Sequence, residues 1–360
     1  MFQFNCFRIL IFTYLISCIY GDIQFNSLSE KLVLSLIKVT PKKNVVASEH
    51  LVRVSLCKLA SIATGDVKQE LMLLLGYKDD VLSKCYSKVA ACINIMKQGD
   101  LTVTNRIYVN YTSDIDPKFI KDSSDHDGVQ VEKVGFNYPN AAIAHINNLL
   151  SAMTYKRMTE IVDSDDVNKT TKIIIISGAH YKGTWEVPFD YRLTKLAKFN
   201  RIDGSTTRIP MMNTMGEFGY STSKLCEARN NGQSPILTMR MISYETSITF
   251  VVPNQAKELG FLLETIYNQK SFVSNHIKAG EVKLMKVTIP KFKIKTFVDW
   301  NGFLQGLGLS SIFNTSSTDM VGIFKADKQN QTISLSKVKQ KVFFQIDEMG
   351  VGRKIPGKKK

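Results

Sequence analysis

The stretch IIIISGAHYKGTW, residues 173–185, says more about the fold than any other part of the sequence. Its first four residues are isoleucines, and such a β-branched run predicts a strand that is buried on both faces. The segment 182–184 then forms a turn, and Trp185, one of only two tryptophans in the chain, follows it. A buried strand over 173–176 is therefore the first expectation.

Outward from this stretch, the sequence predicts strands downstream and helices upstream. Segments 247–252, 282–294 and 333–346 have the composition of strands, and a short helix is expected at 300–307. Upstream, apolar residues recur at helical spacing in three stripes. These stripes are Leu28, Leu32, Leu36 and Val39; Leu51, Val54, Leu59 and Ile62; and Leu82, Cys85, Val89, Cys92 and Met96. Helices first and strands later predict an α+β architecture without a domain boundary.

The N-terminal residues 1–21 have the pattern of a secretory signal peptide. Arg8 precedes the apolar run 9–16, and small Gly21 offers a cleavage position, so the mature chain is expected to begin near Asp22. The alternative is an uncleaved anchor, although the run is shorter than the ~20 apolar residues of a membrane helix. The sequence thus predicts a secreted, extracellular protein with no membrane segment after cleavage.

Four cysteines remain after residue 21, and they are scattered too widely for a disulfide scaffold. Cys85 and Cys92 are seven residues apart on one expected helix face, about 10 Å along the axis, which is too far for a bridge. Buried free thiols are therefore expected at Cys57, Cys85, Cys92 and Cys226.

Charge and acceptor triplets agree with an extracellular protein. The formal net charge is +15, or +14 without Arg8, which favours acidic partners such as sulfated polysaccharide over nucleic acid. Asn-X-Ser/Thr triplets predict glycosylation in surface loops at Asn110, Asn168, Asn314 and Asn330.

Ordered motifs give the chain a resemblance to a known family. Segment 176–185 with Phe189, and Ile209-Pro210-Met211-Met212 after it, resembles the signature of the serpin superfamily. Segments 44–48, 146–149, 287–294 and 307–309 line up in the same order, so the resemblance runs from about residue 28 to 350. It implies a large mixed or antiparallel central sheet with N-terminal helices in a domain spanning 22–350, and a role as a serine-type protease inhibitor rather than an enzyme.

The hinge that introduces the serpin reactive loop departs from the family pattern. The family reads Glu-Glu-Gly-Thr followed by alanines, whereas this chain reads Glu348, Met349, Gly350, Val351, Gly352, Arg353 and so on to Pro356. If Val351 points inward on an inserted strand, Arg353 and Ile355 do so too. A buried unpaired arginine costs several kcal/mol, and Pro356 lacks a strand N–H. The hinge therefore predicts a non-inhibitory member.

Two further departures point the same way. By resemblance, the reactive loop and last strands are replaced by a basic tail over 351–360, so a truncated isoform or gene model of a true inhibitor is an open alternative. The polar positions beneath the family's sheet opening, the shutter, are also rewritten. The shutter and breach positions correspond to Ser48, Ser177, Trp185 and Gln340.

Two lysine stripes offer another class of function, an extracellular glycosaminoglycan-binding module. Lysines alternate with apolar residues, so strand geometry places each set on one face. The stripes are Lys291, Lys293 and Lys295, and Lys337, Lys339 and Lys341. A solvated sheet face is the alternative. The five histidines show no metal-ligand spacing, and neither a metal nor a cofactor is expected; the chain is expected to be a monomer whose partner is an extracellular serine protease or a glycosaminoglycan.

Overall fold

The computed structural model describes residues 2–3, 10–15, 32, 35–40, 43–77, 85, 101–121, 128–181, 183–201, 203–226, 232–242, 246–253, 258–268, 275–276, 280–325 and 331–351. Helices and two sheets make up this part of the chain, in agreement with the α+β prediction.

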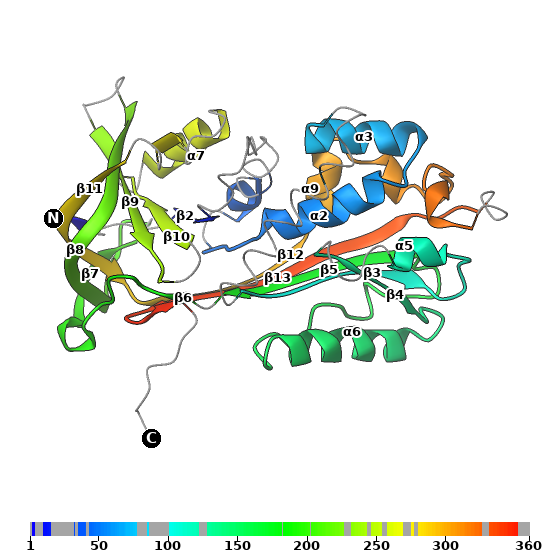
Figure 1. Ribbon diagram of the computed structural model, residues 1–360, viewed down its shortest axis with the longest axis horizontal. Helices are drawn as coiled ribbons and strands as arrows, with labels where there is room; N and C mark the ends of the chain where they lie inside the picture. Colours follow the sequence, from blue (N-terminus) through cyan, green and yellow to red (C-terminus); the bar gives the residue numbers. More distant parts are fainter. Residues whose placement is uncertain are drawn as a thin grey trace.

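One sheet, called the central sheet below, runs through the middle of the molecule (Figure 1). Its strand order is β4, β3, β5, β13, β14, β6, and β12 pairs with the other edge of β13 along part of its length. The parallel pairs are β3 with β4 and β5 with β13, so the sheet is mixed as expected. The bounds are β4 Gln130–Val134, β3 Leu101–Asn110, β5 Ile173–Tyr181, β13 Leu335–Asp347, β14 Gly350–Val351, β6 Gly183–Thr184 and β12 Phe292–Asp299.

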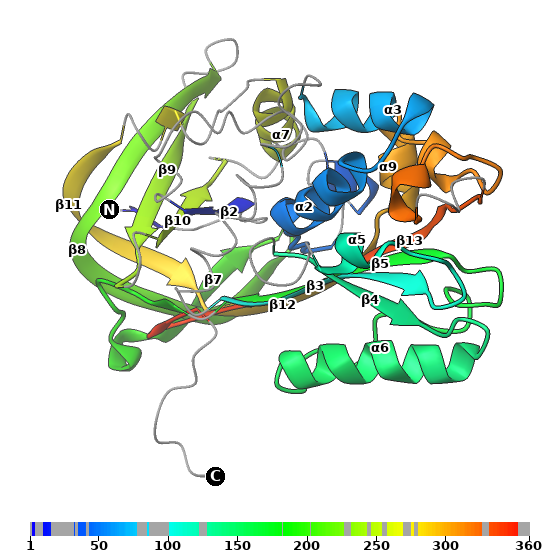
Figure 2. The ribbon, with the colours of Figure 1, turned by 45° about the vertical axis from the view of Figure 1, so that its right-hand side comes forward.

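Helices cover both faces of the central sheet. In Figures 1 and 2, α6 (Pro139–Met153) lies on one face, whereas α2 (Glu49–Ala60), α3 (Gly65–Leu75) and α9 (Asn301–Gly306) lie on the other. The isoleucine run explains this arrangement, because alternate residues of a strand point to opposite faces. Ile173 and Ile175 belong to the apolar cluster under α2, while Ile174 and Ile176 belong to the cluster under α6. The prediction of a strand buried on both faces is confirmed.

Local sequence explains where two of these helices begin and end. Pro139 opens α6, where its fixed backbone angle suits the first helical turn, and Ala142, Ile146 and Leu150 then form its buried stripe. Helix α3 ends at Gly76, which has φ 72° and closes the helix in the left-handed conformation. Other helices are α5 (Pro117–Lys121), α7 (Leu259–Asn268) and the 3₁₀ turns η3 (Tyr191–Leu193), η5 (Ser311–Phe313) and η6 (Val321–Ile323), and residues 35–39 are also helical.

A second sheet, called the curved sheet below, forms one end of the molecule (Figure 2). Its order is β1, β11, β8, β9, β10, β2, and β7 pairs with β8. The predicted strand at 282–294 is in fact two strands, because the chain leaves the curved sheet at Pro290 and enters the central sheet at Phe292. The bounds are β1 Phe2–Gln3, β11 Glu281–Pro290, β8 Thr206–Cys226, β9 Gly232–Arg240, β10 Thr246–Val251, β2 Leu10–Leu15 and β7 Lys195–Asn200.

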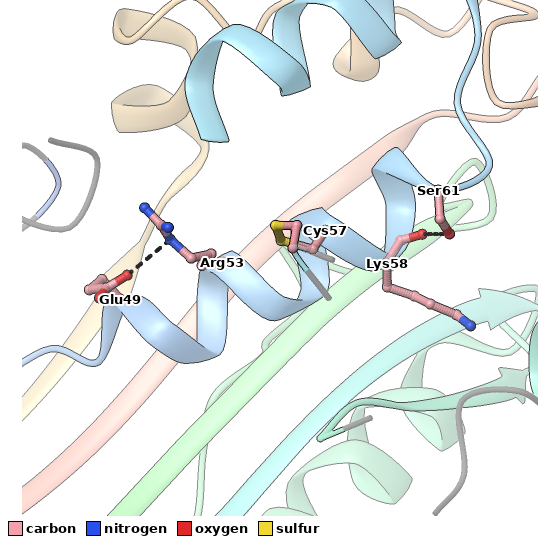
Figure 3. The surroundings of a disulfide bond; sticks show 6 residues. Glu49, Arg53, Cys57, Lys58 and Ser61 are labelled. Carbon is pink, nitrogen blue, oxygen red and sulfur yellow. Dashed lines mark hydrogen bonds and ion pairs between the residues drawn. A yellow bond between two sulfur atoms is a disulfide. The ribbon is translucent and has the colours of Figure 1, made fainter. Parts of the chain in front are cut away.

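The prediction of free thiols is wrong for two cysteines. Cys57 on α2 forms a disulfide with Cys85, and both residues are fully buried (Figure 3). Figure 3 also shows Glu49 and Arg53 on α2, joined by a dashed line. Arg53 Nε lies 3.6 Å from Glu49 Oε2. Of the helix expected over 82–96, only Cys85 lies within the described residues, and it is helical. Cys92 lies outside them.

Candidate functional site: the hinge end of the central sheet

The two middle strands of the central sheet pair along most of their length and then separate. β5 and β13 run in parallel register from Leu335 opposite Ile173 to Phe343 opposite His180. Beyond this point β14 lies between them, antiparallel both to the end of β13 and to β6, which follows β5 along the chain. The chain after β13 thus turns back into its own sheet. We call Asp347–Val351 and β6 the hinge end.

Gly350 makes this return possible. Its φ of 145° lies in the region that favours glycine. A Cβ atom there would overlap the carbonyl oxygen of Gly183 and lie 2.8 Å from its carbonyl carbon and 2.9 Å from Thr184 Cα. The strand after the turn is therefore packed tightly against β6, and Val351 has no exposed surface.

A buried carboxylate anchors the turn. Glu348 Oε2 is 2.6 Å from Lys291 Nζ, and Thr194 Oγ1 donates to Glu348 Oε1 at 3.0 Å. Burial by itself raises the pKa of Glu348, but the hydrogen bonds from Lys291 and Thr194 outweigh this effect and leave the pKa below its ordinary value. Asp347 beside it behaves oppositely, since burial raises its pKa. Glu348 is thus held as a charged group at neutral pH.

Trp185 lies directly against the same turn. Its indole Nε1 donates to the carbonyl oxygen of Asp347 at 3.0 Å, and its backbone N–H donates to that of Met349 at 3.1 Å. The ring contacts Phe189 edge to face, with centroids 6.2 Å apart. The tryptophan singled out in the sequence therefore holds the backbone of the hinge end through two hydrogen bonds.

The three other predicted shutter residues lie together, away from Trp185. Gln340 Nε2 donates to the carbonyl oxygen of Ser48 at 2.7 Å and to Ser177 Oγ at 3.2 Å. In return, the Ser48 backbone N–H donates to Gln340 Oε1 at 2.9 Å. One glutamine side chain thus joins β13 to β5 and to the residue before α2. We call these three residues the Gln340 cluster.

A neighbouring polar pair was not predicted. Ser55 Oγ is 3.0 Å from Asn105 Oδ1, and Asn105 Nδ2 donates to the carbonyl oxygen of Leu51 at 3.1 Å. Asn105 is opposite Ser177 in the pairing of β3 with β5. The signal in the sequence was an asparagine inside an otherwise strand-forming segment, where a polar side chain needs a buried partner.

Of the predicted hinge residues, Glu348, Gly350 and Val351 are brought together at the hinge end. Gly352 and Arg353 lie outside the described residues.

The prediction of a second lysine stripe on an open surface is wrong. Lys337, Lys339 and Lys341 do share a face, but the segment between α6 and β5 covers it. Asp166 of that segment forms ion pairs with Lys339 and Lys337, and Lys341 donates to the carbonyl oxygen of Glu160. Lys339 is only 5% exposed.

The first lysine stripe, Lys291, Lys293 and Lys295, is partly exposed to solvent. Lys291 pairs with Glu348, as described above, whereas Lys293 and Lys295 of β12 are exposed. Lys293 Nζ lies 5.1 Å above the ring of Phe343.

Two of the predicted glycosylation residues are on the surface. Asn168 and Asn314 are exposed, whereas Asn110 ends β3 with 1% exposure and donates to the carbonyl oxygen of Thr171 at 3.4 Å. The prediction of a surface loop is therefore wrong for Asn110. Asn330 lies outside the described residues.

Two other kinds of site are absent from the described ranges. Within them, no three His, Cys, Asp or Glu side chains are grouped to hold a metal ion. Nor is any helix of that part of the chain long and apolar enough to cross a membrane.

Two features define the class of this protein. The chain re-enters its central sheet at Gly350, and the Gln340 cluster joins β13 to β5 in the same sheet. A model of the family described as Serpin (serine protease inhibitor) matches residues 24–354, and the chain therefore belongs to the serpin family. Serpins are protease inhibitors rather than enzymes.

Known relatives agree with this assignment. Antichymotrypsin-2 of Bombyx mori is 24% identical over 333 residues, which cover 90% of this chain and 84% of that protein. The solved structure of native protease nexin-1 with heparin has a TM-score of 0.80 at 21% identity and covers 93% of this chain and 90% of its own. Thyroxine-binding globulin in complex with thyroxine has a TM-score of 0.78 at 18% identity, with coverage of 93% and 90%.

Proposed function

We propose that this chain is an extracellular serpin that binds a ligand or partner and does not form the covalent protease complex of inhibitory serpins. The observation that carries the proposal is the register of β14. Gly350 and Val351 are opposite Asp347 and Ile346 on one side, and opposite Thr184 and Gly183 on the other. This register fixes where each later residue would lie if the strand lengthened.

Arg353 would enter an apolar environment. Continuing the register places it opposite Phe344, on the same face as Val351. Phe344, Ile346 and Val351 belong to one buried apolar cluster. An arginine in that position would lose its hydration without a partner anion, which costs several kcal/mol.

Lys354 would meet a second obstacle. The same register places it between Phe343 and His180, which already pair with each other, so the closed sheet would have to open there. On that face Phe343 lies beneath two cations, Lys293 at 5.1 Å and Arg157 at 5.6 Å from the ring centroid. A third positive charge would be repelled, and insertion beyond Gly352 is therefore disfavoured.

Incubation with trypsin-like, chymotrypsin-like and elastase-like proteases tests the proposal. We expect degradation without an SDS-stable covalent band for any enzyme. The matched variant carries R353A, K354A and P356A, so that the hinge has small residues able to insert. A covalent band from the unmodified chain would overturn the proposal, whereas one from the variant alone would assign the defect to the hinge.

Two observations support the extracellular part of the proposal. The N-terminal apolar run has the composition of a secretory signal, and the Cys57–Cys85 disulfide suits an oxidising compartment. Expression in a secretory cell line should place the chain in the medium as a monomer, with glycans at Asn168 and Asn314. Retention of all the protein inside the cell would contradict this.

A second candidate function, binding of a sulfated polysaccharide, is favoured by the exposed lysines of β12. Lys293 and Lys295 are two residues apart on one strand and point to the same side. With a net charge of +15, the chain should be retained on heparin. K293A/K295A should then elute at clearly lower salt than the control K195A/K198A, which removes the same charge from β7. If the two variants elute at the same salt concentration, retention on heparin depends on net charge alone, and a specific site on β12 is ruled out.

A further inference from the structure

Three cations lie beside one aromatic ring on the face of the central sheet that α6 covers. Phe343 of β13 belongs to the apolar cluster under α6. Lys293 Nζ lies 5.1 Å from the centroid of its ring, and Arg157 Cζ, in the segment after α6, lies 5.6 Å from it. Lys295 is directly opposite Phe343 in the pairing of β12 with β13, so its side chain leaves the sheet on the same face. We call Arg157, Lys293 and Lys295 the Phe343 cations.

The Phe343 cations have no acidic partner in the part of the chain that the structure describes. Neighbouring carboxylates serve other cations, since Glu348 pairs with Lys291 and Asp166 pairs with Lys339. The two lysines are exposed and the arginine is half-buried. Three positive charges are thus accessible from solvent at one place, without an anion from the described residues to balance them.

A buried histidine holds the arginine in position. Arg157 Nη1 contacts both ring nitrogens of His180 and is 2.9 Å from Nδ1. An arginine can only donate, so the imidazole accepts from it in the neutral form. His180 has no exposed surface, and its ring centroid is 5.3 Å from that of Phe343. The guanidinium is therefore anchored on one side, and the other N–H groups of its planar fork suit two oxygens of one anionic group.

Charge repulsion at this place works against the stability of the protein. Lys341 is two residues before Phe343 on the same face, is 9% exposed, and donates to the carbonyl oxygen of Glu160. Burial lowers the pKa of Lys341 and the neighbouring Lys295 lowers it further, whereas Glu160 raises it. Lys295 thus lies close enough to another cation to be repelled by it. A bound anion would offset this repulsion.

We propose that Arg157, Lys293 and Lys295 form one binding site for a sulfate group, the group that a sulfated polysaccharide presents repeatedly along its chain. The proposal rests on the second candidate function above and deepens it, because it adds an anchored arginine from the segment after α6. The two lysines are about 7 Å apart along β12, so they can reach neighbouring sulfate groups while the guanidinium binds two oxygens of one group.

Titration calorimetry of the full chain with sucrose octasulfate, at physiological ionic strength, measures the site. We expect R157A and K295A each to raise the Kd about tenfold, which is the worth of one charge-assisted hydrogen bond. R157K should recover only part of the loss, because it restores the charge without the planar fork. The matched control K198A removes an exposed lysine of β7 and should change the Kd less than about twofold. Kd values of R157A and K295A equal to that of K198A would overturn the proposal.

The stability of K295A shows whether weaker binding comes from the site or from unfolding. Because Lys295 is exposed and is repelled by Lys341, its removal should leave the midpoint of urea unfolding unchanged or raise it at low salt. Weaker binding by a variant at least as stable as wild type supports the site. A lower midpoint that accounts for the loss of binding would contradict it.

Heparin elution separates this proposal from the candidate function on which it rests. If K293A/K295A elutes at clearly lower salt than its control but R157A does not, polysaccharide binding stands and the site with Arg157 is overturned. If neither differs from its control, polysaccharide binding at β12 fails together with the site.

Two further probes test the class of ligand. Inorganic sulfate should bind much more weakly than sucrose octasulfate, and so should an octaglutamate peptide. Equally tight binding of inorganic sulfate would assign the site to the free anion, and equally tight binding of the peptide would assign it to an acidic protein. Either result would overturn the polysaccharide as the ligand.

Discussion

Replacing Gly350 by alanine would test whether β14 is part of the sheet. The new methyl group would overlap the backbone of Gly183 and Thr184, and backbone atoms cannot move aside as a flexible side chain can. The positive φ adds further strain for any residue with a Cβ. The easiest response for the protein is to release β14 from between β13 and β6.

The size of the effect follows from what that release exposes. Val351 would lose its full burial, worth about 2 kcal/mol. The two-residue strand would also lose a few backbone hydrogen bonds, each worth about 1 kcal/mol net. Since the rest of the sheet can stay folded, G350A should lower the free energy of unfolding by about 3–5 kcal/mol and no more.

Urea unfolding followed by tryptophan fluorescence suits this measurement, because Trp185 donates both of its N–H groups to the hinge end. G350A should shift the native emission to longer wavelength as Trp185 meets water. The control is G302A in α9, where a Cβ meets open space and helix propensity should stabilise by up to about 1 kcal/mol. A native spectrum and stability of G350A equal to wild type would refute the placement of β14.

Three further predictions concern the charged anchor, the polar cluster and the disulfide. E348Q should destabilise the protein by about 2 kcal/mol at pH 7 in urea titrations. Because the folded pKa of Glu348 lies below its ordinary value of 4.5, its contribution is present above that value and lost as the pH falls through the lowered pKa; E348Q should lack this acid-dependent loss. Q340A should cost about 2–3 kcal/mol, since it removes three hydrogen bonds in a buried site. C57S should cost roughly 3–4 kcal/mol for a loop with 28 residues of separation, and non-reducing peptide maps of wild type should contain Cys57 linked to Cys85.

Each of these has a control and a contrary outcome. E281Q removes an exposed carboxylate paired with Lys283 and should change stability little at any pH; equal effects of E281Q and E348Q would contradict the anchor. Q305A on the exposed face of α9 should be close to neutral, and a neutral Q340A would contradict the polar cluster. Free thiols at both Cys57 and Cys85 in the secreted protein would contradict the disulfide.

The sequence predicted the core of the fold well where periodicity was strong. Four consecutive isoleucines could only be buried on both faces, and β5 ends at Tyr181, shortly before Trp185, as expected. Of the turn expected at 182–184, the two described residues, Gly183 and Thr184, form the strand β6 instead. The split of 282–294 into β11 and β12 was missed, because Pro290 and Lys291 change the direction of the chain without interrupting its pattern.

Tertiary contacts account for the other errors. Alternation correctly placed Lys339 and Lys341 on one face, but it could not show that residues 154–166 cover that face. The pairing of Cys57 with Cys85 joins two segments whose spacing carries no pairing signal. The Gln340 cluster was found through resemblance, whereas Asn105, which has no such marker, was missed.

The ion pair between Asp166 and Lys339 has a mechanical consequence. Asp166 precedes β5 by a few residues, and Lys339 lies in β13, opposite Ile176 of β5. Moving these two strands apart must therefore either separate two buried charges or drag the covering segment along. The pair acts as a clasp across the seam at which serpin sheets admit a further strand, and both partners are almost fully shielded from salt. Such a clasp opposes separation of β5 and β13, and it therefore supports the proposal that this chain does not form the covalent protease complex of inhibitory serpins.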